Sequence, residues 1–178
     1  NGKGMTYEGI LTTSSIQMAQ KYYELLKKVK NGETDLIIDE KIKQVLPDFP
    51  KFAITYSVSE NEAGSTVNQD KMKESLNDYN KMFGTKYDIS QIQGYNANLN
   101  KRLARKDAKY KSRSEQLDLV IVVDRLLTGF DAPCMSTIFI DRQPMGPHDL
   151  IQAFSRTNRI FDKNKTYGQI VTFQAPVL

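Results

Sequence analysis

The chain has 178 residues, of which 39% are apolar and 26% are charged, a composition typical of one globular domain with a substantial core. Its lone cysteine, Cys134, excludes an internal disulfide, and with the single histidine His148 it offers too few ligands for a zinc site. No run is long enough to cross a membrane and no secretory signal is visible, so we expect a cytoplasmic protein. The net charge of +4 favours an anionic partner such as nucleic acid.

The first part of the chain predicts two strands joined by a helix. Residues 8–15 form a short apolar run that ends in hydroxyl side chains, and the residues after it repeat apolar side chains at helical spacing. Ser14 or Ser15 is the expected N-cap of that helix, and Gly32 closes it. Residues 31–50 are expected to be a loosely structured insertion, and the run KFAITYSV after them predicts the second strand.

The middle of the chain predicts helices. The stretch NEAGSTVNQD at 61–70 is expected to be a polar loop, and a helix at 71–84 is expected to stop at Gly84. A further helix is expected within residues 94–113.

The last third predicts three strands and one helix. The β-branched run LDLVIVVD at 117–124 is typical of a strand buried on both faces, as in parallel sheets. Short strands are expected at 137–141 and 167–173, with a helix at 146–159 between them. The alternation predicts an α/β fold, an open and mostly parallel sheet with helices on both faces, in one domain over residues 1–178. Because the chain lacks an initiator methionine, we expect it to be a fragment of a longer protein.

Two stretches that could bind ligands follow predicted strands, and ligands of open α/β sheets collect beyond the carboxyl ends of the strands. Residues 12–15 place hydroxyls and backbone N–H groups at a helix N-terminus, which suits a phosphate, although plain capping by one of the serines is about as good an explanation. In residues 122–133, Gly129 permits close approach to a ligand and Asp131 can accept from a sugar hydroxyl. A structural turn is the simpler interpretation of this second stretch on its own.

The arginine segment, residues 150–159, is a third candidate, also placed near a carboxyl end. Gln152, Arg156 and Arg159 lie at i, i+4 and i+7, on one stripe of the expected helix, and the arginine fork suits phosphate oxygens. A solvated face would explain Arg159 through an ion pair with Asp162, but Arg156 has no acid at i±3 or i±4. The segment therefore predicts an anion that is not in this chain, or not in this part of it.

A basic stretch, residues 101–113, contains seven Lys and Arg side chains and one acid, Asp107. It either follows DNA phosphates or forms a solvated helix face. No phosphate-binding loop of the form G-x-x-x-x-G-K-[ST] is present, so the run that ends in Asp39 and Glu40 is not interpreted as a Walker B strand. The candidate DNA-contacting residues of the stretch are Lys101, Arg102, Arg105 and Lys106.

Three runs together resemble the second RecA-like domain of superfamily two helicases and translocases. ILTTSSIQMAQKYYELLKKV is similar to motif IV, VIVVDRLLTGFDAP to motif V and DLIQAFSRTNRIFDKNKTYGQIVTF to motif VI. The residues of the last two runs resemble most closely those of motifs V and VI in the motor (R) subunit of type I restriction-modification enzymes. Val123 departs from the threonine that many helicases carry before motif V, so no threonine contact to DNA is carried over.

The resemblance implies a role for each candidate residue. Arg156 and Arg159 would include the arginine finger that faces ATP, with Gln152 beside them. Gly129 and Asp131 would contact the nucleotide ribose. The expected contacts to the DNA backbone in motif IV are Ser14 and Ser15.

The resemblance also implies partners and an activity. The parent subunit would translocate double-stranded DNA at the expense of ATP and cleave it with a separate nuclease domain. A first RecA-like domain would hold most of the ATP and Mg²⁺, and methyltransferase and specificity subunits would complete the complex. The isolated chain is therefore expected to lack ATPase and nuclease activity. Two alternatives stay open: another superfamily two motor, or a non-catalytic nucleic-acid-binding α/β module.

Overall fold

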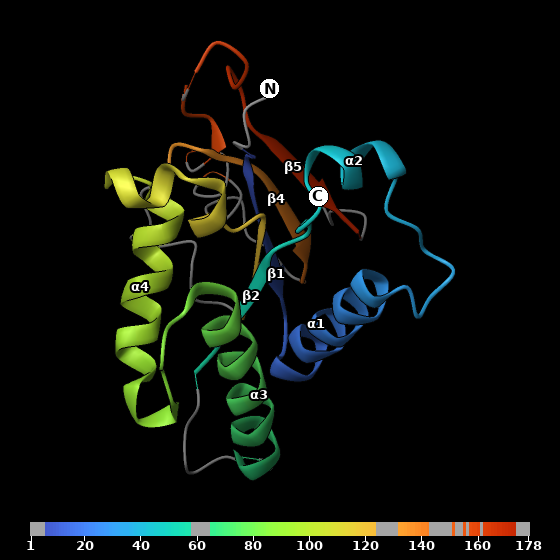
Figure 1. The fold of residues 1–178 in the computed structure, drawn as a ribbon, viewed down its shortest axis with the longest axis vertical. Helices are drawn as coiled ribbons and strands as arrows, with labels where there is room; N and C mark the ends of the chain where they lie inside the picture. Colours follow the sequence, from blue (N-terminus) through green and yellow to red (C-terminus); the bar gives the residue numbers. More distant parts are fainter. Residues whose placement is uncertain are drawn as a thin grey trace.

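The computed structural model describes residues 6–57, 65–123, 132–142, 151, 155, 157–160 and 162–173. In these ranges the strands form one open sheet whose neighbours are all parallel, in the order β2-β3-β1-β4-β5 (Figure 1). This confirms the predicted α/β fold class with an open parallel sheet. The strands are β1 (Glu8–Thr13), β2 (Phe52–Thr55), β3 (Leu119–Val123), β4 (Met135–Asp141) and β5 (Gln169–Thr172).

The centre of the sheet is built from two strands that are buried on both faces. Every residue of β1 is buried, and in β3 the three middle residues are buried. Ile10 of β1 lies beside Val120 of β3 and beside Ile138 of β4. The middle strand of the order is β1, and β3 is the interior strand next to it.

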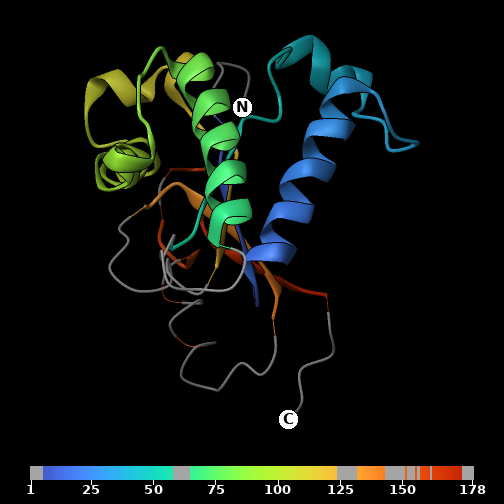
Figure 2. The same ribbon diagram turned by 90° about the horizontal axis from the view of Figure 1, so that it is seen from below.

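Helix α1 (Ile16–Asn31) begins and ends where the sequence predicts. The Ser15 hydroxyl accepts a hydrogen bond from the backbone N–H of Met18, and Gly32 adopts φ 72° at the other end. Both ends therefore follow ordinary capping chemistry. Helix α1 packs on β1, β2 and β3, and α3 (Ser65–Phe83) packs on β2 beside it (Figure 2).

Helix α3 begins inside the stretch that was expected to be a loop. Asn68 lies in its first turns and is buried, because its carbonyl accepts from the Tyr56 hydroxyl and its side-chain oxygen accepts from Gln20. Asn68 thus faces a buried hydrogen-bond network, whereas Thr66 and Asp70 in the same turns are exposed. The predicted stop at Gly84 is confirmed, with φ 65°.

Helix α4 (Ile92–Ala104) is shorter than expected. The chain turns at Arg105, which adopts φ 48°, and continues as two short 3₁₀ turns, Ala108–Lys111 and Arg113–Glu115. A left-handed conformation costs a non-glycine residue free energy, so contacts of the Arg105 side chain must hold it in place.

Two further predictions concern segments that are only partly buried or partly described. In residues 31–50 the helix α2 (Glu40–Val45) has no buried residue, and Ile37 is 81% exposed. The interpretation of this stretch as an insertion stays a prediction. The expected helix at 146–159 lies mostly outside the described residues, of which 151, 155 and 157 are helical.

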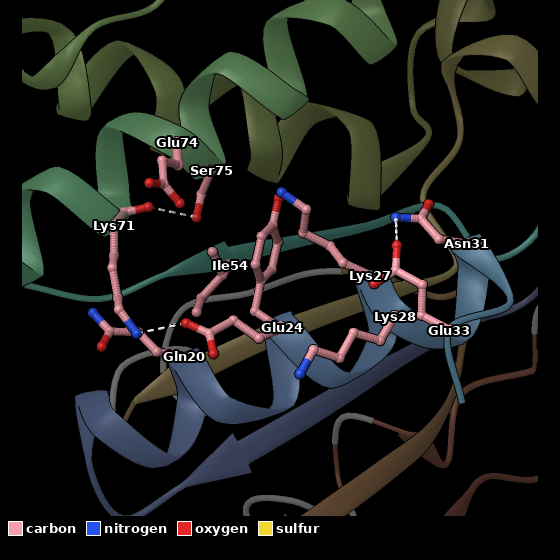
Figure 3. A pocket seen from close by; sticks show the side chains of 11 residues that line it. Gln20, Glu24, Lys27, Lys28, Asn31, Glu33, Ile54, Lys71, Glu74 and Ser75 are labelled. Carbon is pink, nitrogen blue, oxygen red and sulfur yellow. Dashed lines mark hydrogen bonds and ion pairs between the residues drawn. The ribbon is translucent and has the colours of Figure 1, made fainter. Parts of the chain in front are cut away.

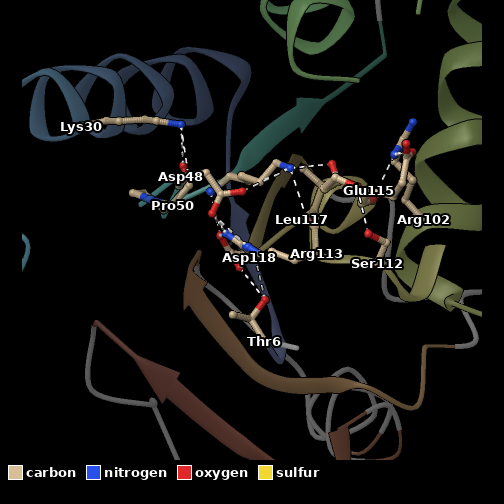
Figure 4. Close-up of polar contacts among 12 residues, drawn as sticks. Thr6, Lys30, Asp48, Pro50, Arg102, Ser112, Arg113, Glu115, Leu117 and Asp118 are labelled. Carbon is tan, nitrogen blue, oxygen red and sulfur yellow. Dashed lines mark hydrogen bonds and ion pairs between the residues drawn. The ribbon is translucent and has the colours of Figure 1, made fainter. Parts of the chain in front are cut away.

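The amino-terminal edge of the sheet is held by an ion-pair network (Figure 4). Arg113 donates to both carboxylate oxygens of Asp118, at 2.5 and 2.8 Å, and to Asp48 at 3.0 Å. Asp118 also accepts from the backbone N–H of Lys51 at 2.7 Å. The network joins the starts of β2 and β3 to the end of the 31–50 stretch, and the Arg113 guanidinium lowers the pKa of the Asp48 carboxyl although partial burial opposes this.

Candidate functional site

The first candidate stretch lies at the carboxyl-terminal edge of the sheet, as predicted. Ser15 caps α1 with its hydroxyl, so one acceptor position of Ser15 is already used. Ser14 is exposed at the same turn. The Thr13 hydroxyl donates to the Ser15 carbonyl at 3.1 Å and fixes the turn. Ser14 is thus the hydroxyl best placed to meet an anion, whereas Ser15 first serves the helix.

The second candidate stretch leaves the sheet beside the first. Val123, the last residue of β3, is the register partner of Thr13, the last residue of β1. The end of β3 therefore lies next to the end of β1, and the chain is described again from Ala132. Gly129 and Asp131, the predicted ribose contacts, lie outside the described residues.

Two side-chain hydrogen bonds connect α1 to the strand ends at this edge. The Tyr22 hydroxyl of α1 donates to Asp141 at the end of β4, at 2.7 Å, and burial together with this carboxylate raises the pKa of Tyr22 to about 12. Gln20 donates to the Tyr56 hydroxyl at 3.0 Å. These contacts connect α1 to the ends of β2 and β4, so they fix the helix that follows the turn at Ser14 relative to the sheet.

The described end of the arginine segment is held by a buried lysine. The Lys165 ammonium donates to the backbone carbonyl of Thr157 at 2.7 Å and also to that of Arg159. Lys165 is 3% exposed and Thr157 is 1% exposed, whereas Arg159 is exposed. The last turn of the segment is therefore anchored on its inner side. Gln152 and Arg156 lie outside the described residues.

Arg159 does not lie at the carboxyl-terminal edge. The carboxylate of Asp162, which follows it closely, accepts from the hydroxyl of Tyr7, just before β1, at 2.8 Å. In Figure 1 the loop at 162–168 lies at the top, near the start of β1, and the start of α1 lies at the bottom. The expectation that all three stretches gather at the carboxyl edge is therefore wrong for this part of the third. The reason is topological: a parallel crossover from β4 must return the chain to the amino edge before β5 begins.

Two of the four predicted DNA contacts in the basic stretch are buried in ion pairs. The Arg102 guanidinium lies 3.7 Å from the centre of the Phe83 ring and 2.5 Å from the Glu115 carboxylate, and its side chain is 0% exposed. Arg105 donates to Glu8 at 2.8 Å, with both side chains almost fully buried. The expectation that Arg102 and Arg105 contact DNA is therefore corrected, because their charges serve the fold.

The lysines of the stretch are exposed, but they lie far from Ser14. Lys101 and Lys106 are both at the surface, and Lys106 follows Arg105, which bonds to the carbonyl of Thr6. Thr6 precedes β1, so this surface belongs to the amino-terminal edge. The predicted DNA contacts thus do not form one continuous patch.

The buried pair at this edge has its own electrostatics. Burial raises the pKa of Glu8 above its usual range, and the Arg105 guanidinium opposes that rise. Burial also raises the pKa of the neighbouring Cys134 thiol, which donates to the carbonyl of Leu103. A buried thiol with a raised pKa is a poor nucleophile, so Cys134 is a packing residue here.

A hollow of about 310 Å³ opens between α1 and α3 (Figure 3). Lysines and glutamates alternate around it, and Lys71 already pairs with Glu24 at 2.5 Å. Lys27 pairs with Asp78 at 2.8 Å. With both signs of charge on its rim, the hollow has no preference for an anion, and none of the predicted site residues lines it.

The described residues contain no group of three or more His, Cys, Asp or Glu side chains arranged to hold a metal ion. No helix in the described ranges has the length and apolar character needed to span a membrane.

Comparison with known proteins decides the family. The family model of type I restriction enzyme subunit R domain 3 matches residues 5–175. The chain belongs to this family. It is 32% identical over 171 residues to the type I restriction enzyme SauCOLORF180P endonuclease subunit of Staphylococcus aureus (strain COL), covering 94% of this chain and 17% of that protein.

A second relative gives the same picture. The SsaAORF53P endonuclease subunit of Staphylococcus saprophyticus is 33% identical over 169 residues, again 94% of this chain and 17% of the relative. The chain thus spans about a sixth of the length of these curated relatives. Among solved structures, T. fusca Cas3 matches with a TM-score of 0.45 and 13% identity, over 97% of this chain and 15% of that one.

The resemblance carried by motifs IV, V and VI is confirmed at the level of the family. The sequence did not single out Lys165 or Gly168, which hold the arginine segment. A buried lysine and a close glycine depend on the path of the loop, and the only local signal was the turn-forming composition of residues 162–164.

Proposed function

We propose that this domain is the second motor domain of the R subunit of a type I restriction enzyme. In the parent subunit it would take part in ATP-driven translocation of double-stranded DNA, which leads to cleavage by a separate nuclease domain. Membership of the R-subunit family supports the proposal, and the named relatives are endonuclease subunits. Because the chain spans 17% of those relatives, the activity belongs to the larger subunit.

The observation that carries the proposal is the exposed Arg159 on an anchored backbone. A cation that stabilises a transition state works best when its position is set before the reaction, because no reorganisation is then needed. The Lys165 bonds to the carbonyls of Thr157 and Arg159 provide such an anchor. Toward ATP we assign Arg159, Arg156 and Gln152, with Gly129 and Asp131 toward the ribose.

The donor chemistry of the domain fits a shared nucleotide site. Arginine forks bind phosphate oxygens, whereas Mg²⁺ prefers carboxylate oxygens and water. The described residues contain no cluster of carboxylates suited to Mg²⁺. As the family resemblance implies, we assign most of the ATP and Mg²⁺ contacts to a first RecA-like domain. Bound there, ATP supplies the phosphoryl group, and this domain supplies positive charge to it.

We place the main DNA contact of the domain at the carboxyl-terminal edge. Ser14 is exposed there, and the preceding residue, Thr13, lies beside Val123 at the end of β3. Ser15 would add its hydroxyl as a donor while still capping α1. The exposed Lys101 and Lys106 are a second, separate candidate at the other edge. Methyltransferase and specificity subunits would complete a cytoplasmic complex.

The proposal is tested by Arg159→Ala and Arg156→Ala in the full-length subunit. We expect ATP turnover in the presence of DNA to fall by about 10³-fold or more, because an arginine finger contributes roughly 10³–10⁵ in rate. Nucleotide binding should change little, since the arginines act on charge that grows in the transition state. The measurement is steady-state ATPase with a thermal melt alongside it. Lys163→Ala, an exposed cation near the same segment, is the matched control. Turnover within a few-fold of wild type in well-folded arginine variants would contradict the proposal.

A further inference from the structure

The end of the arginine segment is held by more contacts than a helix end requires. Lys165 is almost fully buried and donates to the carbonyls of Thr157 and Arg159. A cation at a helix C-terminus satisfies carbonyls that have no partner within the helix. An exposed lysine or a water molecule could donate the same hydrogen bonds. A buried lysine, which is itself held in place by packing, also fixes the positions of the two carbonyl groups.

Gly168 adds an independent steric contact. A Cβ atom at this position would lie 2.1 Å from the Cβ of Thr157 and 2.4 Å from its carbonyl carbon. Such distances are far inside van der Waals contact, so a residue larger than glycine would displace Thr157. The backbone of Thr157 thus accepts a hydrogen bond from the Lys165 ammonium group and packs against Gly168.

The loop that carries both residues is itself tied to the sheet. The Asp162 carboxylate accepts from the backbone N–H groups of Asn164 and Lys165, both at 2.8 Å, and from the Tyr7 hydroxyl. These bonds hold the pKa of Asp162 below its usual range. Tyr7 immediately precedes β1, so this hydrogen bond fixes the position of the loop relative to the central strand.

We propose that the loop at residues 162–168 is a positioning device for the arginine segment, with Lys165 as its positioning residue and Gly168 as the contact that sets the spacing. The proposal rests on the proposed function, in which Arg159 acts on ATP. It goes further by naming residues that touch neither nucleotide nor DNA and yet control the rate.

The first test is Lys165→Met in the full-length subunit, which keeps the length and apolar stem of the side chain and removes its charge and hydrogen bonds. We expect kcat for DNA-stimulated ATP hydrolysis to fall by about 10–100-fold, because small misplacements of a catalytic group cost rates of this order. The KM for ATP should stay within a few-fold of wild type. Rates are expressed per nucleotide-binding site, so that unfolded protein does not count as slow enzyme.

The second variant is Gly168→Ala, which leaves the Lys165 side chain unchanged and displaces Thr157 by steric contact. The same split between kcat and KM is expected. Lys163→Met is the matched control, because Lys163 lies in the same loop but is exposed. It should leave both parameters unchanged. If Lys165→Met does not fold, Gly168→Ala carries the test, and the converse also holds.

The outcomes separate the two proposals when Arg159→Ala is measured in parallel. If Arg159→Ala loses turnover and both loop variants keep a normal kcat per site, the positioning proposal is overturned and the proposed function stands. If both loop variants only lower the melting temperature or the number of sites, the loop is a structural cap and the positioning proposal is also overturned. If Arg159→Ala turns over ATP normally, both proposals fail.

Discussion

At the scale of single residues, arginines and lysines of the basic stretch have different functions. Arg105 bonds to Glu8 and Arg113 bonds to Asp118, so these guanidinium groups hold strand starts together. The lysines at 101 and 106 stay at the surface. A planar fork that makes several bonds at once is suited to a buried carboxylate, whereas a long flexible ammonium is easily solvated. Within this stretch, the arginines at 102, 105 and 113 hold the fold, whereas the lysines at 101 and 106 are exposed.

This division predicts the effect of breaking the buried pair. Arg105→Met leaves the Glu8 carboxyl buried without its partner, and we expect a loss of about 3–5 kcal/mol in the free energy of unfolding. The double variant Glu8→Met and Arg105→Met should lose less, because no unpaired charge is left behind. Urea unfolding of the chain measures both. Lys101→Met, at an exposed position, is the control and should stay within about 0.5 kcal/mol. A single variant as stable as the control would show that the pair contributes no net stability.

At the scale of elements, local chemistry predicted the structure where the ends of an element are marked by its own residues. Ser15 and Gly32 bound α1 as expected, and Gly84 ends α3. The predictions failed where distant contacts decide. The turn at Arg105 has no glycine or proline, and its left-handed conformation is held by Glu8, which lies 97 residues away in the sequence.

The same reason limited the prediction of the site. The arginine stripe and the hydroxyl turn were visible as sequence patterns, but the separation of Arg159 from the hydroxyl turn follows from the crossover to β5. Lys165 and Gly168 meet Thr157 only because the loop folds back on the segment. Sequence motifs thus supplied the candidate residues, and the topology decided which of the described ones share an edge.

Two glycines give a test of opposite sign at the element scale. Gly84 has a positive φ of 65° and no atom within 4 Å of an added Cβ, so Gly84→Ala meets only a conformational penalty. We expect it to lower the free energy of unfolding by about 1 kcal/mol. Gly94 lies inside α4, where its added Cβ would meet the Tyr87 ring at 3.4 Å. Gly94→Ala should raise the free energy by about 0.5–1 kcal/mol through helix propensity. Equal shifts in denaturant midpoint for both variants would contradict this assignment of the helix ends.

At the scale of the whole molecule, the sheet separates two surfaces with different chemistry. The carboxyl-terminal edge presents the hydroxyl turn at Ser14, and the amino-terminal edge presents the end of the arginine segment and the exposed lysines. Under the proposed function, the domain would meet nucleotide and DNA at once without either blocking the other. Parallel strands meet this need, because all their carboxyl ends lie on one side and each crossover returns the chain to the other.

This separation predicts which edge of the sheet binds DNA. In the full-length subunit, Ser14→Asp places a negative charge where we assign a phosphate, so DNA affinity should fall by about 10-fold or more, since a hydrogen bond to a charged group contributes roughly 1.5–3 kcal/mol. Neutralising the exposed lysines at 101, 106, 109 and 111 should weaken binding only a few-fold. The salt dependence of binding should stay nearly unchanged, because we assign no phosphate contact to these lysines. Each phosphate contact that was lost would lower the slope of log affinity against log salt by about 0.9. Ser112→Asp, an exposed serine in the basic stretch, is the matched control for added charge. Salt titrations of binding to double-stranded DNA measure both quantities. A large loss of affinity in the lysine variant, with normal binding by Ser14→Asp, would move the DNA to the amino-terminal edge.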